Sequence, residues 1–283
     1  MPNPLSALKK KTASSDPEAF RDKVVWITGA SSGIGEALAV ALAGRGARVV
    51  LSARRQEELQ RVAARCKQEG ANDRDILVLP LDVTDTDFLP EATSAVLEHF
   101  HHIDLLINNA GLSQRSLCKD TDISVYRKLL DVDVLGQIAL TKAVLPYMLD
   151  RGTGHIAVTA SVAGKIGAPL RTGYCAAKHA VMGFFDALRA EVEDDGVKVS
   201  TIVPGFIRTS IARNALIADG ATFDDEDANI EGGMDVDECA QVILAGLAKG
   251  SREIPVGKGR EMAALWVKRL SPELVFRLTK QLG

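Results

Sequence analysis

The stretch VVWITGASSGIG (residues 24–35) joins a short apolar run to a helical pattern through a glycine-rich turn. Glycines permit positive φ and let a backbone approach a ligand closely. A helix that begins near Gly33 would direct unpaired N–H groups and the positive end of its dipole at a pyrophosphate. A glycine-rich turn without a ligand is the alternative, but the strand before it and the helix after it favour a dinucleotide site. The residues expected to bind are Gly29, Ser31, Ser32, Gly33, Ile34 and Gly35.

The alternation of strand and helix patterns continues along the chain. Apolar, β-branched runs predict strands over residues 24–28, 48–52, 76–81, 103–108, 155–160, 197–203 and 253–256. Helical patterns fill the intervals near 34–45, 55–68, 88–100, 122–149, 173–194 and 236–249. Apolar strands separated by helices predict a parallel sheet covered on both faces. Right-handed crossovers then give a single-domain, doubly wound Rossmann-type α/β sheet of about seven strands, with ligands at the carboxyl ends of the strands.

The composition narrows the function classes. The chain has 283 residues and a formal net charge of -3, and it lacks the basic stripe that nucleic-acid binding needs. Four cysteines that lie far apart in the sequence predict free thiols in a reducing, cytoplasmic environment, and no metal site. Residues 1–20 are polar and predict a flexible arm, not a signal peptide. No apolar run approaches the roughly 20 residues of a membrane-spanning helix.

The end of the second predicted strand bears on the choice of cofactor. In dinucleotide folds an acidic residue here binds the ribose hydroxyls of NAD, whereas an arginine accommodates the 2′-phosphate of NADP. Ala53 stands where the acid is expected, and Arg54 and Arg55 follow it. Their guanidinium groups suit phosphate oxygens. Both arginines could instead be solvated residues of a first helical turn, paired with a neighbouring glutamate, but the missing acid favours NADP(H).

Two further strand ends suit a nucleotide. Asp82 and Val83 follow the third strand, where a carboxylate could accept a hydrogen bond from the adenine amino group. Asp82 alone could equally be a turn or cap residue. Asn109, Ala110 and Gly111 follow the fourth strand, where small residues let the backbone approach a ribose. Each signal is weak singly, and together with the glycine turn they indicate one nucleotide groove.

A candidate catalytic group follows the fifth strand. Ser161 comes directly after the strand, and Tyr174 and Lys178 stand at i and i+4 in the next helical pattern. That spacing places both side chains on one helix face. A tyrosine hydroxyl is a poor acid or base at neutral pH, and a nearby ammonium stabilises its ionised form. A proton can then pass between tyrosine and a substrate oxygen, to which Ser161 can donate a hydrogen bond.

Five motifs, in order and at matching spacings, resemble those of the short-chain dehydrogenase/reductase family. They are TGASSGIG (28–35), NNAG (108–111), Ser161, YCAAK (174–178) and PGFIRT (204–209). The resemblance implies a catalytic domain over 21–257, hydride transfer to or from a nicotinamide ring, and contact of Lys178 and Tyr174 with the cofactor. It also implies that the last motif lines the nicotinamide, through Pro204, Gly205, Ile207 and Thr209.

One position departs from the family pattern. The family has an asparagine within an Asn-x-x-Gly pattern in its fourth helix, which is thought to support a kink and a water that reaches the active lysine. Asp133 stands at that place here, with Gly136 after it. A buried carboxylate is costly unless it is protonated or paired. We expect Lys178 to be an indirect partner through water, and Asp133 to be a fourth catalytic residue that leaves activity intact and alters the pH profile.

The substrate side is less specific. The segments LSARR, DILVLPLDVTD and GLSQRSLCKDT resemble the dehydrogenase/reductase member 7 branch of the family, whose members reduce retinal, steroids, quinones and other bulky carbonyls. The irregular segment 205–236 predicts a substrate loop, and its acidic run, 224–227, predicts a solvated face. An apolar pocket would be completed by Leu112, Gln114, Leu117 and residues 162–170.

Residues 258–283 predict a helical extension. Its cations Lys268, Arg269, Arg277 and Lys280 flank an apolar set, and Pro272 predicts the start of a second short helix. Packing against the body or across a dimer is the first interpretation, and contact with a membrane surface is the second. The apolar set comprises Ala263, Leu265, Trp266, Leu270, Leu274, Val275 and Leu278.

Together these features predict an NADP(H)-dependent oxidoreductase that transfers hydride between nicotinamide and a carbonyl or alcohol group. The substrate would be a hydrophobic ketone, aldehyde, retinoid, steroid or quinone-like compound, held by Ser161 and Tyr174. The rival interpretation is a catalytically silent NADP-binding scaffold or sensor, because a fold alone does not fix a function. A dehydratase or epimerase fits less well, since those usually carry a larger C-terminal domain. The resemblance implies a homodimer or homotetramer built on the helices that carry Asp133 and Tyr174.

Overall fold

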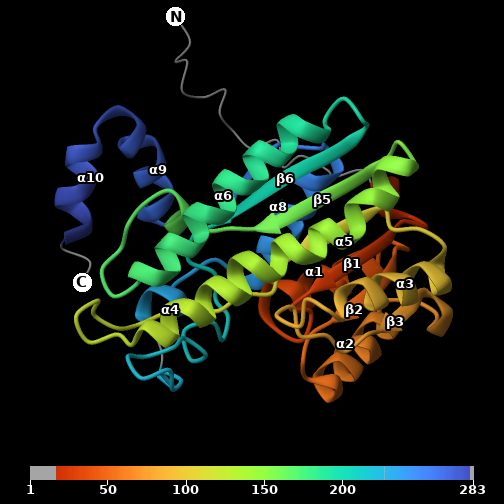
Figure 1. The fold of residues 1–283 in the computed structure, drawn as a ribbon, viewed down its shortest axis with the longest axis horizontal. Helices are drawn as coiled ribbons and strands as arrows, with labels where there is room; N and C mark the ends of the chain where they lie inside the picture. The colour runs from red at the N-terminus through yellow and green to blue at the C-terminus, as the bar shows by residue number, and fades with distance from the viewer. Residues whose placement is uncertain (1–16, 226, 281–283) are drawn as a thin grey trace, which may run out of the picture.

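A seven-stranded parallel sheet organises residues 17–225 and 227–280, which are the residues that the computed structural model describes (Figure 1). Its strands lie in the order β3-β2-β1-β4-β5-β6-β7, and every neighbouring pair is parallel. The chain therefore builds outward from β1 to one edge and then returns to build from β4 to the other. Crevices that bind ligands form at such a reversal, here between β1 and β4. The predicted doubly wound sheet is confirmed.

The observed strands follow the predicted ones closely. They cover Val24–Thr28 (β1), Arg48–Ser52 (β2), Ile76–Val78 (β3), Leu105–Asn108 (β4), Gly154–Thr159 (β5), Val197–Pro204 (β6) and Glu253–Val256 (β7). The third strand is shorter than predicted, although Leu81 N still donates to Ala53 O at 3.0 Å. β4 begins at Leu105, not at Ile103; directly before it, the carboxylate of Asp104 accepts the N–H of Val24.

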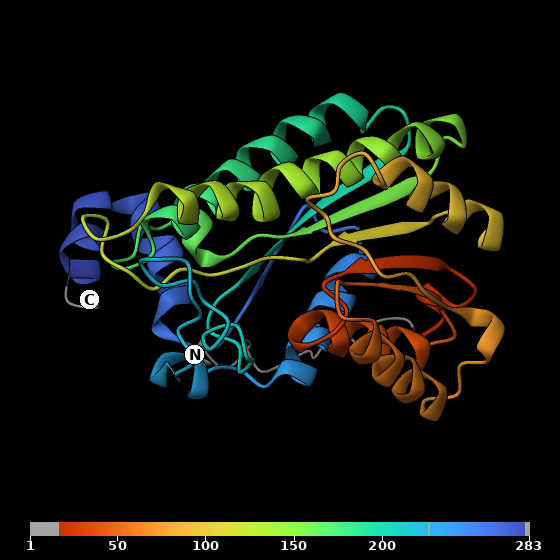
Figure 2. The same ribbon diagram turned by 60° about the horizontal axis from the view of Figure 1, so that its bottom comes forward.

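Helices cover both faces of the sheet (Figure 2). One face is packed by α1 (Gly33–Ala43), α2 (Gln56–Gln68) and α8 (Val236–Ala248), and the other by α3 (Leu89–Phe100), α5 (Gly136–Asp150) and α6 (Thr172–Val192). Alternate side chains of β1 point to opposite faces of the sheet. Val25 and Ile27 belong to the core on the α1, α2 and α8 side (the first core), and Val24 and Trp26 belong to the core on the α3, α5 and α6 side (the second core). This two-sided burial explains why the strands read as continuous apolar runs.

The long helix predicted over 122–149 is in fact two helices joined by a π-helical turn. α4 covers Ile123–Leu130, the turn covers Asp131–Leu135, and α5 follows directly. Such turns are rare and occur mostly at functional sites; this one carries the fully buried Asp133. The composite helix 123–150 is long and apolar enough to cross a membrane by length and composition, contrary to the expectation from the sequence. Its buried residues, among them Leu140 and Val144, pack against the sheet.

The two ends of the described chain are also structured. Pro17–Phe20 forms a 3-10 turn, and Phe20 is buried in the first core, so the predicted arm is shorter than 1–20; the remainder of that prediction lies outside the described residues. The predicted substrate loop contains the short helix α7 (Ala228–Glu231). The predicted extension forms α9 (Arg260–Leu270) and α10 (Pro272–Thr279).

Candidate active site

Tyr174 and Lys178 lie one turn apart on α6, and both are buried. The Nζ atom of Lys178 is 5.7 Å from the centroid of the Tyr174 ring. The same Nζ donates a hydrogen bond of 3.0 Å to the carbonyl oxygen of Thr159, the last residue of β5. The i, i+4 spacing thus places a fixed ammonium beside the phenol at the carboxyl edge of the sheet.

Asp133 completes this buried group by a direct contact. Its Oδ2 lies 3.3 Å from Nζ of Lys178, and its Oδ1 accepts the backbone N–H of Leu112 at 2.7 Å. The expectation of an indirect contact through water is therefore wrong. Asp133 lies within the π-helical turn, and its carboxylate contacts the ammonium directly.

Burial and charge act against each other in this pair. Burial raises the pKa of Asp133, and the charge of Lys178 opposes that rise. Burial also lowers the pKa of Lys178, but the carboxylate of Asp133 outweighs it, so the pKa of Lys178 is raised. Because the two groups interact strongly, they titrate as a unit. The lysine stays positively charged across the neutral range.

Ser161 stands at the turn after β5. Its Oγ accepts the N–H of Ala163 at 3.1 Å, which caps the short 3-10 helix Val162–Gly164. Its hydroxyl also lies 3.5 Å from the carbonyl oxygen of Pro204 at the end of β6. The cap fixes the acceptor side of the oxygen, and only a weak contact uses its proton, so the hydroxyl can be redirected to a substrate oxygen.

Gln114 has a role that sequence reasoning missed. It was expected to line the substrate pocket, yet it is fully buried. Its Oε1 accepts the N–H groups of Gly173 and Tyr174 at 2.6 and 3.3 Å. These are among the first N–H groups of α6, which have no partner within the helix. Gln114 therefore holds the first turn of the helix that carries the tyrosine, and no local pattern announces this contact.

The glycine turn has a rigid, crowded shape. Gly29 has φ +64, and a Cβ there would lie 2.9 Å from Cα of Ala110. A Cβ on Gly35 would lie 2.3 Å from the carbonyl oxygen of Gly29. Only glycine fits at these positions, so the turn is held flat against the NNAG segment and opens α1 at Gly33. The N–H groups of that first turn can hold a pyrophosphate, as the sequence predicts.

Asn109 ties three strand ends together below this turn. Its Nδ2 donates to the carbonyl oxygen of Thr28 at 3.1 Å, and its Oδ1 accepts from the hydroxyl of Thr159, also at 3.1 Å. The hydroxyl of Thr28 in turn accepts the N–H groups of Asn109 and Ala110 at 3.0 Å. The next residue, Gly111, packs beside Asp133 and Lys178. The NNAG segment thus connects the nucleotide groove to the catalytic group.

The PGFIRT segment meets the same groove from the other side. A Cβ on Gly33 would lie 3.3 Å from the Cγ2 methyl of Thr209, so the last motif residue touches the glycine turn. Pro204 ends β6, Gly205 N donates to Val256 O at 2.8 Å, and Ile207 is buried. The glycine turn, the NNAG segment and the PGFIRT segment thus converge at the carboxyl edge of the sheet, where ligands bind in open α/β folds.

A cavity of about 310 Å³ lies beyond the end of β2. Arg54 and Asp82 line it from the sheet edge, and Arg127 and Lys128 line it from α4. Asp82 also accepts the N–H and the hydroxyl of Thr84, so its turn role is real. The cavity thus has three cations in its lining and lies where the adenosine end of the cofactor is expected. The sequence did not predict the two cations from α4, because α4 is far along the chain from Arg54.

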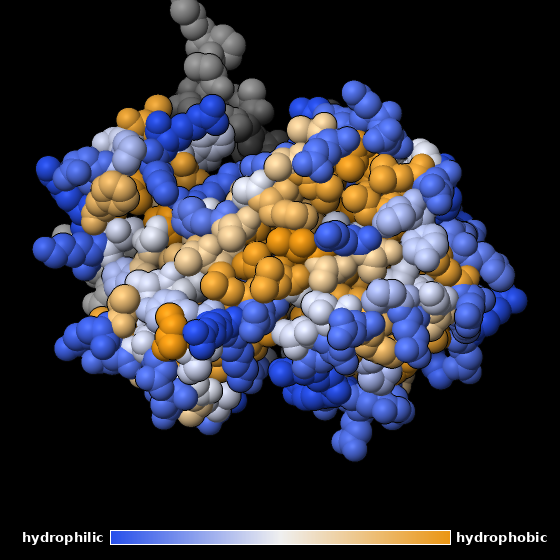
Figure 3. Space-filling view, in the orientation of Figure 1, coloured by the Kyte–Doolittle hydropathy of each residue, from blue (hydrophilic) through white to orange (hydrophobic). Residues whose placement is uncertain are grey.

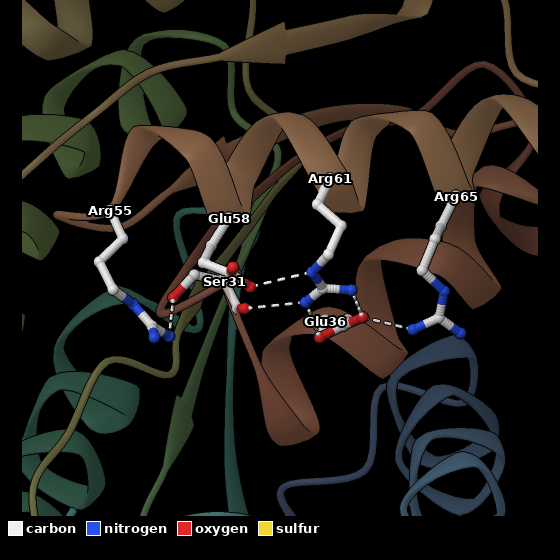
Figure 4. A network of polar contacts seen from close by, with 6 residues as sticks. All are labelled: Ser31, Glu36, Arg55, Glu58, Arg61 and Arg65. Carbon is white, nitrogen blue, oxygen red and sulfur yellow. Dashed lines mark hydrogen bonds and ion pairs between the residues drawn. The ribbon is translucent and has the colours of Figure 1, made fainter.

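Arg55 and its neighbours on α2 brace the glycine turn (Figure 4). Arg55 Nη2 donates to the hydroxyl of Ser31 at 3.2 Å, and not to a glutamate as the alternative interpretation held. Arg61 and Arg65 both pair with Glu36 in the first turn of α1. Burial raises the pKa of Glu36, but the hydrogen bonds from the two arginines outweigh it, and the net pKa is lowered. The i, i+4 spacing of the arginines was a signal that could have predicted this brace.

Asp227 corrects the prediction of a solvated acidic face. Its neighbours Asp224 and Asp225 are exposed, but Asp227 is buried and forms ion pairs with Arg115 and Arg171. Burial raises the pKa of Asp227, but the N–H of Asn229 and the two arginines outweigh it and lower the pKa. The pairs fasten the substrate loop to the segment after β4 and to the start of α6.

Comparison with known proteins shows what this arrangement is similar to. Residues 23–219 match the family model described as short chain dehydrogenase. The chain is 43% identical over 264 residues to human dehydrogenase/reductase SDR family member 7, covering 93% of this chain and 78% of that protein. It is 42% identical over 258 residues to Drosophila melanogaster dehydrogenase/reductase SDR family protein 7-like, covering 90% and 78%.

Solved structures share the fold. A short chain dehydrogenase/reductase from Burkholderia phymatum in complex with NAD has a TM-score of 0.80 at 25% identity, over 90% of this chain and 96% of that one. An alcohol dehydrogenase from Thermococcus sibiricus complexed with 5-hydroxy-NADP has a TM-score of 0.71 at 27% identity, over 84% and 97%. One neighbour holds NAD and the other an NADP derivative, so the choice of nicotinamide depends on residues of this chain.

Proposed function

The chain belongs to the short-chain dehydrogenase/reductase family of oxidoreductases, and on that premise we propose that it is an NADP(H)-dependent carbonyl reductase. The reaction is reversible in principle as an alcohol oxidation. The observation that carries the proposal is the buried set of Tyr174, Lys178 and Asp133 beside Ser161, at the carboxyl edge of the sheet.

The residues have separate tasks in this reaction. When bound, the nicotinamide supplies or accepts a hydride. Tyr174 donates its phenolic proton to the carbonyl oxygen, and the fixed charge of Lys178 stabilises the phenolate that is left. Ser161 donates a hydrogen bond to the same oxygen, where negative charge develops. Gln114 keeps Tyr174 in place through the first turn of α6.

The preference for NADP(H) is supported by the cavity lined by Arg54, Arg127 and Lys128. A 2′-phosphate carries extra negative charge and suits a guanidinium fork. Ala53 stands at the position where NAD-binding relatives of this fold carry the ribose-binding acid, so that particular carboxylate is absent. The three cations of the cavity outnumber its two acids, Asp82 and Asp131.

The proposed substrate is a hydrophobic ketone, aldehyde, retinoid, steroid or quinone-like compound. The segment that follows β4 contributes the half-buried Leu112 and the exposed Leu117, and Ile166 contributes from the segment after Ser161. These side chains would give the pocket wall an apolar character. The substrate loop packs on this region through Leu216, which lies in one apolar cluster with Leu112, and it is tied down by the ion pair of Asp227 with Arg115.

A second candidate function, a catalytically silent NADP-binding scaffold, is favoured by one observation. The ammonium of Lys178 is engaged by the carboxylate of Asp133, which draws part of its charge away from Tyr174. The two functions differ in turnover and not in binding, so kinetics separate them.

The test is NADPH oxidation with a panel of aldehydes, ketones and quinones, repeated with NADH. We expect turnover with bulky apolar carbonyls and a preference for NADPH that Arg54→Asp reverses toward NADH. NADPH binding without oxidation by any substrate would support the scaffold. An unchanged ratio of the two kcat/KM values in Arg54→Asp would overturn the assignment of NADP.

We also propose a cytoplasmic homo-oligomer. The free thiols of Cys66, Cys118, Cys175 and Cys239 suit a reducing compartment. An apolar band crosses the face formed by α5 and α6 (Figure 3). Leu135, directly before α5, and Tyr147, within α5, are exposed. Exposed bands of this kind mark interaction sites, and a two-fold pairing of the same helices would bury the band.

A further inference from the structure

We propose that α9 and α10 dock this protein on an anionic membrane surface, beside the entrance to the substrate site. The two helices form a corner of the molecule (Figure 1). In the described residues 17–225 and 227–280, five of the twelve large exposed hydrophobic side chains lie within thirteen consecutive positions. They are Trp266, Leu270, Leu274, Phe276 and Leu278.

The helices are fixed to the body while they present these side chains. Val275 is 1% exposed and belongs to the second core, and Met262, Leu265 and Val267 pack against that core. Trp266 is 72% and Leu270 87% exposed. The apolar set predicted from the sequence is thus divided between an anchoring side and an outward side. A large exposed apolar patch held by a rigid support is typical of an interaction surface.

The positive charge of residues 260–280 favours an anionic membrane as the partner of this surface. Residues 260–280 hold five cations and two acids in a chain whose net charge is -3. One acid, Glu261, turns inward and accepts the N–H of Phe206; the other, Glu273, pairs with Arg277. The outward charge is therefore positive and lies beside Trp266 and leucines, which is the composition of helices that lie on anionic lipid.

A second copy of the chain fits this patch less well. A two-fold interface places the same surface of both copies against each other. Such an interface would bring the two cation-rich segments, Arg269 among their residues, close together, whereas lipid phosphates and carboxylates neutralise them. The apolar band over α5 and α6, which exposes Tyr147, carries fewer cations and is the better face for self-association.

The patch lies close to the proposed substrate site, so docking would bring that site to the membrane. This part of the inference rests on the proposed function. α9 contacts the 3-10 helix that follows Ser161. Lys268 donates to the carbonyl oxygen of Lys165, and Glu261 holds the backbone of Phe206 in the PGFIRT segment. An apolar carbonyl compound dissolved in a bilayer would thus reach the site from the membrane without crossing water.

The experiment measures binding of the full chain to vesicles and requires no turnover. The sequence holds two tryptophans; Trp26 is fully buried and Trp266 is exposed, so a shift of emission reports Trp266. We expect a blue shift and co-sedimentation with phosphatidylcholine–phosphatidylserine vesicles at low salt, and much less with phosphatidylcholine alone. Trp266→Phe should remove the shift and keep co-sedimentation.

Variants separate the two contributions. Arg269→Gln with Lys280→Gln should weaken binding roughly 25-fold, since each cation near an anionic surface contributes about fivefold. Trp266→Ser with Leu270→Ser should reduce it at least as far. Val242→Ser, on the outer side of α8, is the matched control and should bind as the wild type does.

Three results would overturn the proposal: no binding to the mixed vesicles at low salt, binding that the paired variants leave unchanged, or a dimer that Trp266→Ser with Leu270→Ser dissociates without any lipid binding. Vesicle binding by a chain that turns over no carbonyl would instead leave the docking surface standing and remove the proposed activity.

Discussion

Asp133 and Lys178 form a direct ion pair in which Oδ2 lies 3.3 Å from Nζ and neither side chain is more than 4% exposed. Removing one partner of such a pair leaves a buried charge and is costly. The ion pair has two effects on the catalytic group. It fixes the lysine beside Tyr174, and it divides the charge of the lysine between the tyrosine and the carboxylate.

Asp133→Asn should move the pH–rate profile to lower pH. The carboxylate is what raises the pKa of Lys178 against burial, so its loss lowers that pKa. The ammonium, while it remains protonated, then acts on Tyr174 with its whole charge. The asparagine still offers an oxygen to the N–H of Leu112. The measurement is kcat against pH in both directions, with the exposed Asp150→Asn as the control. A profile that stays in place would show that the carboxylate takes no part in the proton path.

Tyr174→Phe should lower kcat by about 10²–10⁴-fold, which is the usual contribution of a positioned proton donor. The substitution removes only the hydroxyl, so the buried ring continues to pack and the fold should persist. NADPH affinity, measured by fluorescence titration, should change little. Tyr147→Phe, which changes an exposed tyrosine on α5, is the matched control and should keep full turnover. Equal loss of turnover in both variants would contradict the role of Tyr174.

Gln114→Ala should reduce both stability and kcat. The variant leaves the N–H groups of Gly173 and Tyr174 without an acceptor, and each buried unpaired group costs about 1–3 kcal/mol. Chemical denaturation gives the loss of stability. Gln114→Glu keeps an acceptor for these N–H groups and should restore most of kcat. A purely structural role would instead lower the stability of Gln114→Ala and leave the kcat of the folded enzyme at the wild-type value.

Much of the fold could be predicted from local sequence patterns. Strands that are buried on both faces appear as apolar runs, and each run is followed by residues with the periodicity of a helix. The glycine turn, Ser161, Tyr174 and Lys178 were found for the same reason: each lies at a strand end or has a helical spacing that places it. The groove that they form follows from strand order, which right-handed crossovers restrict to few choices.

The missed features are contacts between distant segments. Asp227 is 112 residues away from Arg115 along the chain and 56 away from Arg171. Considered without these partners, the acidic run 224–227 could only be predicted to be exposed to solvent. The π-helical turn at Asp131–Leu135 inserts one extra residue into a continuous helical period, and no breaker residue marks it. Its effect, a carboxylate that touches Lys178 without a water between them, could not be derived from spacing.

Asp227→Asn should loosen the substrate loop. The ion pairs to Arg115 and Arg171 lose their charge, which costs about 1.5–3 kcal/mol for bonds of this kind. We expect a higher KM with kcat changed less, and faster proteolysis within residues 213–225. Asp224→Asn is the control, because that exposed residue keeps its bond to Thr222 as an asparagine.

Acid should have a similar effect on the loop. Because the arginines and the N–H of Asn229 lower the pKa of Asp227 from its ordinary acidic value, its pairs persist at neutral pH and are lost only as the pH falls through that lowered pKa. Proteolysis of the wild-type loop should therefore be flat between neutral pH and mild acid. A rise near neutral pH would show that another group controls the loop.

Arg127 and Lys128 should discriminate between the two nicotinamides although neither lies in a recognised motif. Both line the cavity of about 310 Å³ that Arg54 and Asp82 close from the sheet side. A charged hydrogen bond contributes about 1.5–3 kcal/mol, so Arg127→Ala should raise the KM for NADPH roughly 10-fold to 100-fold.

The KM for NADH, which has no 2′-phosphate, should stay near its wild-type value. Added salt should narrow the difference, since part of the attraction is screened. Lys142→Ala, an exposed cation on α5, is the control and should change neither constant. An equal rise for both cofactors would place Arg127 against the adenine or the shared ribose, and the 2′-phosphate would then depend on Arg54 alone.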